Sequence, residues 1–390
     1  METLKRIQSI DLLRGLVMVI MALDHTRDYF HVTAMSADPL DPATTTTALF
    51  FTRWITHFCA PIFVFLSGLS AYLSAQRKSP AQASRFLLQR GIWLIVVEII
   101  IVTLGLTFNP LYNFIILQVI WVIGWSMILL SILSRISYHL VVAIGIVLVF
   151  GHDLINYMAI PGTGVAGIMI KVLFTAFGTV LPLDQTHFLG VFYAILPWTG
   201  IMFLGYAAGA WYKQGIPAVT RIKYLLFAGL GAVALFILLR VYNGYGDPSL
   251  RKSYPEFYQQ VLSFLNTSKY PPSLLYTCMT IGPALLLLAL LENTKNKFTK
   301  VISTYGSVPF FYYIIHFYLL HFLLVIAFFI TGHTSKEIIQ MPFLFRPVVF
   351  GFSLPVVYLI WLIVVASLYR PCVWFRNYKA TNNHWWLSYV

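Results

Sequence analysis

About ten apolar runs, each close to the 20 residues that an α-helix needs to cross a bilayer, follow one another along this chain of 390 residues. They lie near residues 10–31, 48–74, 86–107, 112–134, 138–158, 189–211, 224–242, 272–292, 306–330 and 347–369. The composition excludes a soluble domain, because 59% of the residues are hydrophobic and only 10% are charged. The sequence therefore predicts an all-α, polytopic membrane protein with about ten transmembrane helices.

The charges between the runs predict the orientation in the membrane. When successive runs alternate in direction, lysine and arginine gather on one side, and the positive-inside rule then places both termini in the cytoplasm. The apolar stretch 162–183 is predicted to be interfacial or re-entrant, because another crossing there would move Lys213, Arg221 and Lys223 outside. These topology and headgroup signals account for the net charge of +13, so no nucleic-acid partner is predicted.

No linker, low-complexity segment or internal repeat divides the chain. We predict one integral-membrane domain over residues 1–390, with residues 370–390 as an interfacial C-terminal segment rich in aromatic residues. The first run is charged and lacks a cleavage site of small residues, so we expect it to stay in the protein rather than act as a signal peptide. Cys59, Cys278 and Cys372 are widely separated and indicate neither a zinc site nor a redox pair.

The first run carries the most informative charges. Arg14 and His25 are eleven residues apart, about 16 Å and nearly three whole helical turns, so both point to one side. Asp24 precedes the histidine and Asp28 follows it by one turn, and a carboxylate beside an imidazole can fix its tautomer. Two plainer interpretations stay open: a solvated ion cluster at the helix end, and an interfacial Arg14 paired with Asp11. Because charges inside a bilayer are costly, we predict an active site along this helix.

The second and third runs add further candidates. His57 and Ser67 are on the second run, where Pro61 can free a backbone carbonyl for a ligand. Small residues near Ser67 are explained equally well by helix packing. Arg85 and Arg90 mark the cytoplasmic end of the third run, where basic side chains serve either phosphate binding or topology.

The last candidates come from the ninth run and from the segment before the eighth. Tyr312 and His316 are four residues apart and share a helix face, where each also fits the role of a core residue. His321 is turned away from His316, and this spacing does not form the usual helical metal pair, so no metal site is predicted. Lys269, in a Lys-Tyr-Pro-Pro-Ser stretch outside the membrane, suits either an acidic group of an acceptor or a lipid headgroup.

Several of these motifs resemble a known group of membrane acyltransferases. Arg14, ten further residues and His25 resemble the R-x10-H signature of acyltransferase-3-type proteins, and residues 63–68 (Phe-Val-Phe-Leu-Ser-Gly) resemble their Phe-rich SG motif. Segments 9–25, 269–274, 307–316 and 370–386 are similar to a bacterial group related to heparan-α-glucosaminide N-acetyltransferase. The resemblance covers nearly the whole chain and implies an integral protein of a bacterial cytoplasmic membrane.

The resemblance implies a transmembrane acyltransferase that takes an acyl group, typically acetyl from acetyl-CoA, in the cytoplasm. It implies delivery to an amine or hydroxyl of a carbohydrate or glycolipid acceptor outside, with His25 catalytic and Arg14 in the donor site. The eukaryotic acetyltransferase carries asparagine where this chain has His25 and a catalytic histidine further on, with His31 as a partial counterpart. The choice among histidines therefore stays open.

The predicted site residues are, by role, catalytic His25, Asp24, Asp28 and His316; donor-binding Arg14, Ser67, Arg85 and Arg90; and acceptor-binding His57, Lys269 and Tyr312. We expect His25 to act as a general base, with a covalent acyl-histidine as the chemical alternative. Tyr312 and His316 are expected to stabilise the oxyanion or to line the path to it. The rival function is a transporter or flippase that uses the same charges as a proton or substrate path. The sequence leaves a homo-oligomer open.

Overall fold

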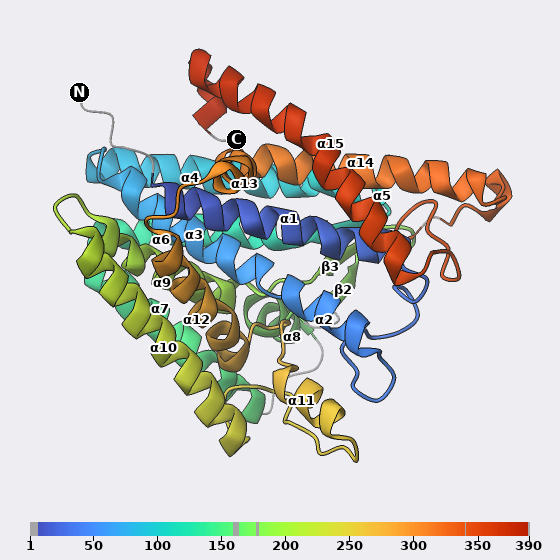
Figure 1. Ribbon diagram of the computed structural model, residues 1–390, viewed down its shortest axis with the longest axis horizontal. Coiled ribbons are helices and arrows are strands. Elements are labelled where there is room, and N and C mark those ends of the chain that lie inside the picture. The colour runs from blue at the N-terminus through green and yellow to red at the C-terminus, as the bar shows by residue number, and fades with distance from the viewer. Residues whose placement is uncertain (1–6, 159–163, 177–178, 340, 389–390) are drawn as a thin grey trace.

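The computed structural model describes residues 7–158, 164–176, 179–339 and 341–388, and it consists mainly of helices (Figure 1). Its α-helices are α1 (Gln8–Phe30), α2 (Thr47–Thr56), α3 (Cys59–Ala75), α4 (Pro80–Val97), α5 (Thr103–Thr107), α6 (Val119–Ile136), α7 (Tyr138–Gly151), α8 (Gly164–Ile170), α9 (Ile195–Gly209), α10 (Ala218–Tyr242), α11 (Phe257–Leu265), α12 (Leu274–Leu291), α13 (Lys297–Ser307), α14 (Pro309–Ile330) and α15 (Leu354–Thr381). The π-helical turns are η1 (Glu98–Val102) and η3 (Lys171–Thr175), and the 3-10 turns are η2 (His152–Tyr157), η4 (Ala210–Tyr212), η5 (Ser335–Glu337) and η6 (Trp385–Ser388).

Eight helices of the described chain are long and apolar enough to cross a membrane. They span Thr47–Ala75, Pro80–Thr107, Val119–Ile136, Tyr138–Tyr157, Ala218–Tyr242, Leu274–Leu291, Pro309–Ile330 and Leu354–Thr381. The predicted all-α, polytopic membrane fold is confirmed. The other two predicted crossings correspond to the 23-residue α1 and the 15-residue α9, which η4 extends.

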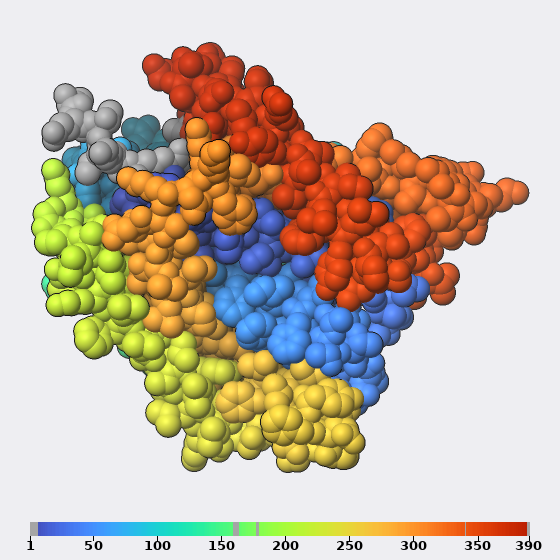
Figure 2. All heavy atoms as spheres, in the orientation of Figure 1, coloured from blue at the N-terminus to red at the C-terminus, as the bar shows by residue number. Residues whose placement is uncertain are grey.

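Helix α1 lies in the middle of the molecule (Figure 1). It packs against α2, α3, α12, α13, α14 and α15, and only a narrow strip of it reaches the face shown in Figure 2. Its charged residues include Asp11, Arg14, Asp24, Arg27 and Asp28. The surrounding helices shield these charges from lipid, which explains how so polar a helix can be placed inside a membrane protein.

Two predicted crossings begin as strands, which corrects the helical interpretation of their first residues. β1 (Phe114–Leu117) pairs in parallel with β3 (Phe188–Val191), and β2 (Thr179–Pro182) pairs antiparallel on the other side of β3. The following helices, α6 and α9, begin only at Val119 and Ile195. The prediction was wrong here because a short apolar run does not distinguish a buried strand from a helix.

The predicted re-entrant stretch 162–183 contains α8, η3 and β2 instead of a crossing helix. Residues 162–163 and 177–178 of this stretch lie outside the described residues. At the C-terminal end, α15 continues past residue 370 to Thr381, so the first half of the predicted interfacial segment prolongs the last crossing. Residues 389–390 of that segment also lie outside the described residues.

The second crossing is interrupted between α2 and α3. Pro61 has no amide hydrogen, so the carbonyl of His57 lacks its donor within the helix. The hydroxyl of Tyr276 on α12 donates to this carbonyl at 2.7 Å. The carbonyl that we expected to be open to a ligand therefore connects the junction of α2 and α3 to α12.

Close backbone contacts fix the helices that carry Arg14 and Ser67. A Cβ atom on Gly15 would lie 2.0 Å from the carbonyl oxygen of Ile302, and one on Gly306 would lie 1.8 Å from that of Asp11. Helices α1 and α13 therefore touch at a level where only glycine fits. Gly68 of α3 makes the same kind of contact with α9, where an added Cβ would lie 1.9 Å from the carbonyl oxygen of Met202. These contacts set the positions of the neighbouring Arg14 and Ser67.

Candidate functional site

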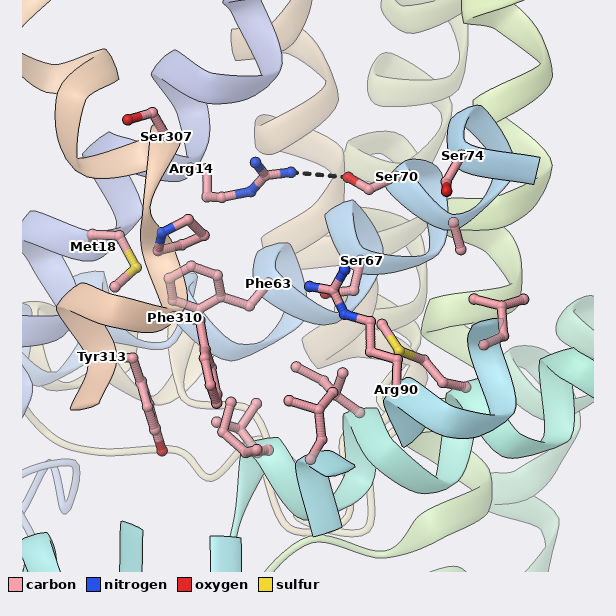
Figure 3. A pocket seen from close by; sticks show the side chains of 18 of the residues that line it. Arg14, Met18, Phe63, Ser67, Ser70, Ser74, Arg90, Ser307, Phe310 and Tyr313 are labelled. Carbon is pink, nitrogen blue, oxygen red and sulfur yellow. Dashed lines mark hydrogen bonds between the residues drawn. The ribbon is translucent and has the colours of Figure 1, made fainter. Parts of the chain in front are cut away.

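A cavity of about 270 Å³ lies between α1, α3, α4, α6 and α14, at the end of α1 that carries Arg14 (Figure 3). We call it the inner pocket, after the cytoplasmic side predicted for this end. Its polar lining residues are Arg14, Ser67, Ser70, Ser74, Arg90, Ser307, Tyr313 and Lys379. The remaining walls are apolar and include Met18, Phe63 and Phe310. Basic and hydroxyl groups beside apolar walls suit a ligand with an anionic head and a less polar arm.

Arg14 is held in place by contacts with three helices. Its Nη2 donates to Ser70 Oγ of α3 at 2.9 Å, and its Nη1 lies 3.3 Å from Asp11 Oδ1 on α1 and 3.3 Å from the carbonyl oxygen of Gly306 on α13. The expected contact with Asp11 is therefore present, yet the same guanidinium also lines the pocket. A partly neutralised, firmly positioned arginine is suited to orient an anion.

Arg90 reaches the inner pocket from α4, across from Arg14 (Figure 3). Its Nε is buried without a hydrogen-bond partner in the described chain, and its charge interacts with that of Arg14. Lys379 adds a third cation from α15. Arg85, in contrast, is exposed and does not line the pocket. The structure thus brings together Arg14, Ser67 and Arg90 of the predicted donor-binding residues but leaves Arg85 outside.

Helix α14 begins at the inner pocket and connects it to His25. Phe310 and Tyr313 line the pocket, and His316 follows Tyr313 by about one turn. The Nδ1 atom of His25 lies 2.7 Å from Nε2 of His316, and the two rings stack at a centroid distance of 5.0 Å. The ring of Phe317 packs 4.3 Å from that of His25. Two of the predicted catalytic residues, far apart in sequence, therefore form a hydrogen-bonded pair.

The next contact gives this hydrogen bond a direction. Nδ1 of His316 lies 3.2 Å from the backbone carbonyl oxygen of Tyr312. Because a carbonyl only accepts, Nδ1 of His316 carries a hydrogen, and its Nε2 accepts from Nδ1–H of His25 when both rings are neutral. The Nε2 atom of His25 then carries a lone pair, and this atom makes no hydrogen bond in the described chain. His25 is thus set up as a base or a nucleophile at Nε2.

The charged residues beyond His25 form a group that we call the outer cluster: Asp24, Arg27, Asp28, Arg53 and Lys269. Arg53 Nη1 of α2 donates to both oxygens of Asp24, at 2.7 and 2.5 Å. Arg27 Nη2 lies 2.6 Å from Asp28 Oδ1 and 3.4 Å from Asp24 Oδ1. Neither carboxylate hydrogen-bonds His25 in the described chain, which corrects the expected direct contact. His316, not an aspartate, fixes the tautomer of His25.

Lys269 is the outer-cluster residue that pairs with no carboxylate in the described chain, and His57 lies beside the cluster. The Nζ of Lys269 lies 5.1 Å from the ring centre of Tyr270 and 5.8 Å from that of Tyr193, and its charge interacts with His25. His57 is buried, interacts electrostatically with Arg53 and Lys269, and has no hydrogen-bond partner at Nδ1 in the described chain. Two of the predicted acceptor-binding residues are therefore brought to one place, on the far side of His25 from the inner pocket.

Tyr312 belongs neither to the inner pocket nor to the outer cluster. Its side chain is fully buried against the ring of Tyr305 at 5.4 Å, and it does not line the inner pocket. It contributes to the site the carbonyl oxygen that orients His316 and a ring that stacks on that imidazole at a centroid distance of 5.7 Å.

His31, the alternative catalytic histidine, lies just beyond the end of α1. Its Nδ1 lies 3.0 Å from Thr33 Oγ1, and its backbone carbonyl accepts from Arg346 Nη2 at 2.7 Å. Burial, with the charges of Arg27 and Arg346, lowers the pKa of His31. It has no hydrogen bond or ring contact with the His25–His316 pair in the described chain, so the geometry favours His25.

Five polar pocket residues were not among the predicted site residues: Ser70, Ser74, Ser307, Tyr313 and Lys379. Ser70 follows Ser67 by one helical turn, so spacing alone could have found it. Lys379 belonged to the predicted interfacial segment 370–390, and Tyr313 to the segment 307–316 that carries the family resemblance. In the described chain, no group of three or more His, Cys, Asp or Glu residues is placed to hold a metal ion.

A comparison with protein families identifies the family of this chain. The family model described as heparan-alpha-glucosaminide N-acetyltransferase, catalytic, matches residues 6–241. The match includes Arg14, His25, Ser67 and Arg90, whereas His316 and Lys379 lie beyond it. No curated protein matches the chain.

Proposed function

Since the chain belongs to the family of heparan-alpha-glucosaminide N-acetyltransferase catalytic regions, and so to a family of membrane acetyltransferases, we propose that it transfers acetyl from acetyl-CoA to a carbohydrate. The acceptor group is an amine or hydroxyl of a carbohydrate or glycolipid on the opposite side of the membrane. One observation carries the proposal: a basic pocket at one end of α1 is joined, along α1 and α14, to a hydrogen-bonded histidine pair with a free Nε2.

The inner pocket fits the two parts of acetyl-CoA. Arg14, Arg90 and Lys379 come from three different helices and offer positive charge to the phosphates. The serine hydroxyls and apolar walls suit the arm that carries the thioester. Arg14 and His25 are separated by about 16 Å along α1, so an arm that follows α14 past Phe310 and Tyr313 brings the acetyl group toward the imidazole.

The His25–His316 pair supplies the chemistry. Nε2 of His25 removes a proton from the acceptor amine or hydroxyl as it attacks the thioester carbonyl carbon. The carbon–sulfur bond breaks, and the imidazolium returns the proton to the departing thiolate, so that CoA leaves as a thiol. His316 stabilises the imidazolium, because Nδ1–H of a charged ring donates a stronger hydrogen bond to its Nε2.

The covalent alternative uses the same atom. If Nε2 of His25 attacks the thioester, an acyl-histidine forms and CoA leaves before the acceptor binds. A brief incubation with labelled acetyl-CoA alone, followed by acid quenching, separates the two routes, since labelled protein and ping-pong kinetics are expected only for the covalent one.

The outer cluster suits the acceptor side. The charge of Lys269 acts on His25 and on His57, whereas the arginines and aspartates of the cluster bind one another. The inner pocket then faces the cytoplasm, where acetyl-CoA is available, and a bacterial cytoplasmic membrane fits this arrangement. Labelling of single cysteines introduced beside Lys379 and Lys269 by an impermeant thiol reagent checks the orientation: the two positions must react from opposite sides.

The test of the function uses the purified full-length protein in detergent. Acetyl-CoA should raise the melting temperature, as a ligand of the native state does, and the protein should transfer labelled acetyl to an amino sugar. His25→Ala should lower transfer by about 10²–10⁴-fold while the acetyl-CoA-dependent thermal shift remains. His139→Ala, at an exposed position of α7, is the matched control for loss of a histidine.

Two outcomes would overturn the function. The first is a wild-type protein that neither transfers acetyl nor gains stability at saturating CoA esters, which favours a transporter or flippase. The second is near wild-type transfer by His25→Ala, which removes the imidazole from the mechanism.

A further inference from the structure

Tyr313 lines the inner pocket and carries a hydroxyl group that nothing in the described chain binds. Its side chain is only 4% exposed, and its hydroxyl oxygen is buried without a hydrogen-bond partner. Among the buried polar atoms that lack a partner, two belong to the lining of the inner pocket: Arg90 Nε and Tyr313 Oη. A buried donor left unsatisfied costs free energy, so both atoms point to a ligand that satisfies them.

The position of Tyr313 along α14 tells which part of a ligand it meets. It lies after Phe310 and one turn before His316, at the opposite end of the pocket's labelled residues from Arg14 (Figure 3). The rings of Tyr313 and His25 both contact Phe317, at centroid distances of 5.1 and 4.3 Å, and both contact His316, at 5.7 and 5.0 Å. The hydroxyl-bearing ring and the imidazole therefore flank the same two aromatic rings.

We propose that the Tyr313 hydroxyl donates a hydrogen bond to the carbonyl oxygen of the acetyl thioester while His25 acts on the acceptor. The inference rests on the proposed function and adds a catalytic residue to it. As the acceptor attacks, the carbonyl oxygen becomes an oxyanion, and a donor already fixed in a site that excludes water stabilises that charge strongly. The phenol keeps its proton throughout, so proton transfer from acceptor to imidazole to thiolate is unchanged.

The two residues first expected to stabilise the oxyanion are unsuited to it. In the neutral pair, the one N–H of His316 is given to the carbonyl of Tyr312, and its other nitrogen accepts from His25. The hydroxyl of Tyr312 is buried outside the pocket lining. Among the α14 residues that line the pocket, Tyr313 has a hydroxyl donor without a partner in the described chain.

Glu98 offers the competing explanation for the hydroxyl. This buried carboxyl group interacts electrostatically with Tyr313. In the described chain, only one of its oxygens has a hydrogen-bond partner: Oε1 accepts from the backbone N–H of Gln118 at 2.7 Å. If the phenol served Glu98, its removal would destabilise the fold. If the phenol serves the thioester, its removal would leave the free protein equally stable or more stable, because an unsatisfied buried donor is lost.

The test compares Tyr313→Phe with the wild type in purified full-length protein. We expect kcat to fall about 10²–10³-fold, the usual loss for one oxyanion donor, with an unchanged KM for acetyl-CoA and no fall in melting temperature. S-ethyl-CoA, a thioether that lacks the carbonyl oxygen, should bind both proteins equally. Tyr318→Phe is the matched control on α14, since its hydroxyl donates to the carbonyl of Ile101 at 2.8 Å; it should lose stability and keep its kcat.

Three results overturn the inference. An unchanged kcat removes Tyr313 from the chemistry, a lower melting temperature assigns the phenol to Glu98, and weaker binding of S-ethyl-CoA makes Tyr313 a general binding residue. In each of these cases the wild type still transfers acetyl. Failure of the wild type to bind acetyl-CoA or transfer acetyl is a different outcome, since it overturns the function itself together with this inference.

Discussion

Both ends of α1 carry arginines, but the outer arginines lie closer to carboxylate oxygens than the inner ones do. In the outer cluster, Arg53 and Arg27 lie within 2.6 Å of aspartate oxygens. In the inner pocket, Arg14 divides its donors among a serine, a carbonyl and Asp11, and Arg90 has no ion pair in the described chain. The same residue type is thus used for internal structure at one end and presented to a cavity at the other.

The contrast shows how one helix can hold two kinds of polar site inside a membrane. Buried charges that pair with one another connect α1 to α2 and carry little net field. Charges that face each other across a cavity create a positive potential that an anion relieves. The charges at the inner end are therefore available to bind a ligand. Most of the charges at the outer end instead bind one another and help to position His25.

The largest expected effect comes from breaking the outer network. Asp24→Ala leaves Arg53 and part of Arg27 buried without their carboxylate, and removal of one partner of a buried pair costs about 3–5 kcal/mol. Melting temperature and the monodisperse fraction in detergent measure it. Asp11→Ala at the inner end is the comparison, since Arg14 keeps Ser70 and Gly306 as partners. Equal losses of stability at the two ends would break the distinction.

The next effect concerns the histidine pair. His316→Ala removes the acceptor for Nδ1–H of His25, so the tautomer with a free Nε2 is no longer fixed. We expect kcat to fall about 10²-fold without a change in acetyl-CoA binding. Steady-state kinetics with acetyl-CoA and an amino sugar measure both quantities. A variant that instead loses donor binding at full kcat would place His316 in the pocket's function rather than in catalysis.

A smaller effect is expected at the inner end. Arg90→Ala removes a cation that no carboxylate neutralises, and loss of one charged hydrogen bond raises the Kd for acetyl-CoA about tenfold or more. Stability and kcat at saturating donor should stay near wild type. Arg77→Ala, an exposed arginine between α3 and α4, is the control for the loss of positive charge alone. An equal rise in Kd for both variants would mean that only the net charge matters.

The smallest effect is that of salt. Added monovalent salt should weaken acetyl-CoA binding by a few-fold, because ions screen charges at an open pocket. The melting temperature of the free protein should change little, since the outer pairs are buried and screened less. Isothermal titration calorimetry at two ionic strengths measures the affinity for acetyl-CoA, and melting curves at the same ionic strengths measure the stability of the free protein. Binding that is indifferent to salt would contradict a phosphate-binding role for the inner pocket.

The sequence alone predicted the features that depend on spacing within one helix. The runs of about 20 apolar residues predicted the membrane fold, and the eleven-residue spacing of Arg14 and His25 placed them on one continuous helix, as α1 has them. The contact between Asp11 and Arg14 also followed from a three-residue separation.

The features that sequence reasoning missed depend on contacts between distant segments. No local signal tells that His316 meets His25 or that Lys379 reaches the pocket, because these depend on how α14 and α15 pack. Asp28 was expected beside His25 from its spacing, but the nearby Arg27 binds it instead. The strands at residues 114–117 and 188–191 were missed because their pairing is made with one another, 74 residues apart in register.

The glycine contacts beside Arg14 and Ser67 have a practical consequence for identifying similar sites in other chains. The arginine-to-histidine spacing is short and arises easily by chance, whereas a side chain of any size at Gly15, Gly306 or Gly68 would overlap a backbone carbonyl. A chain with the spacing but with bulkier residues at those places must separate α1 from α13, or α3 from α9, and thereby change the shape of this pocket. The presence of glycine at these three positions is thus a stricter criterion for recognising the site than its charged residues are.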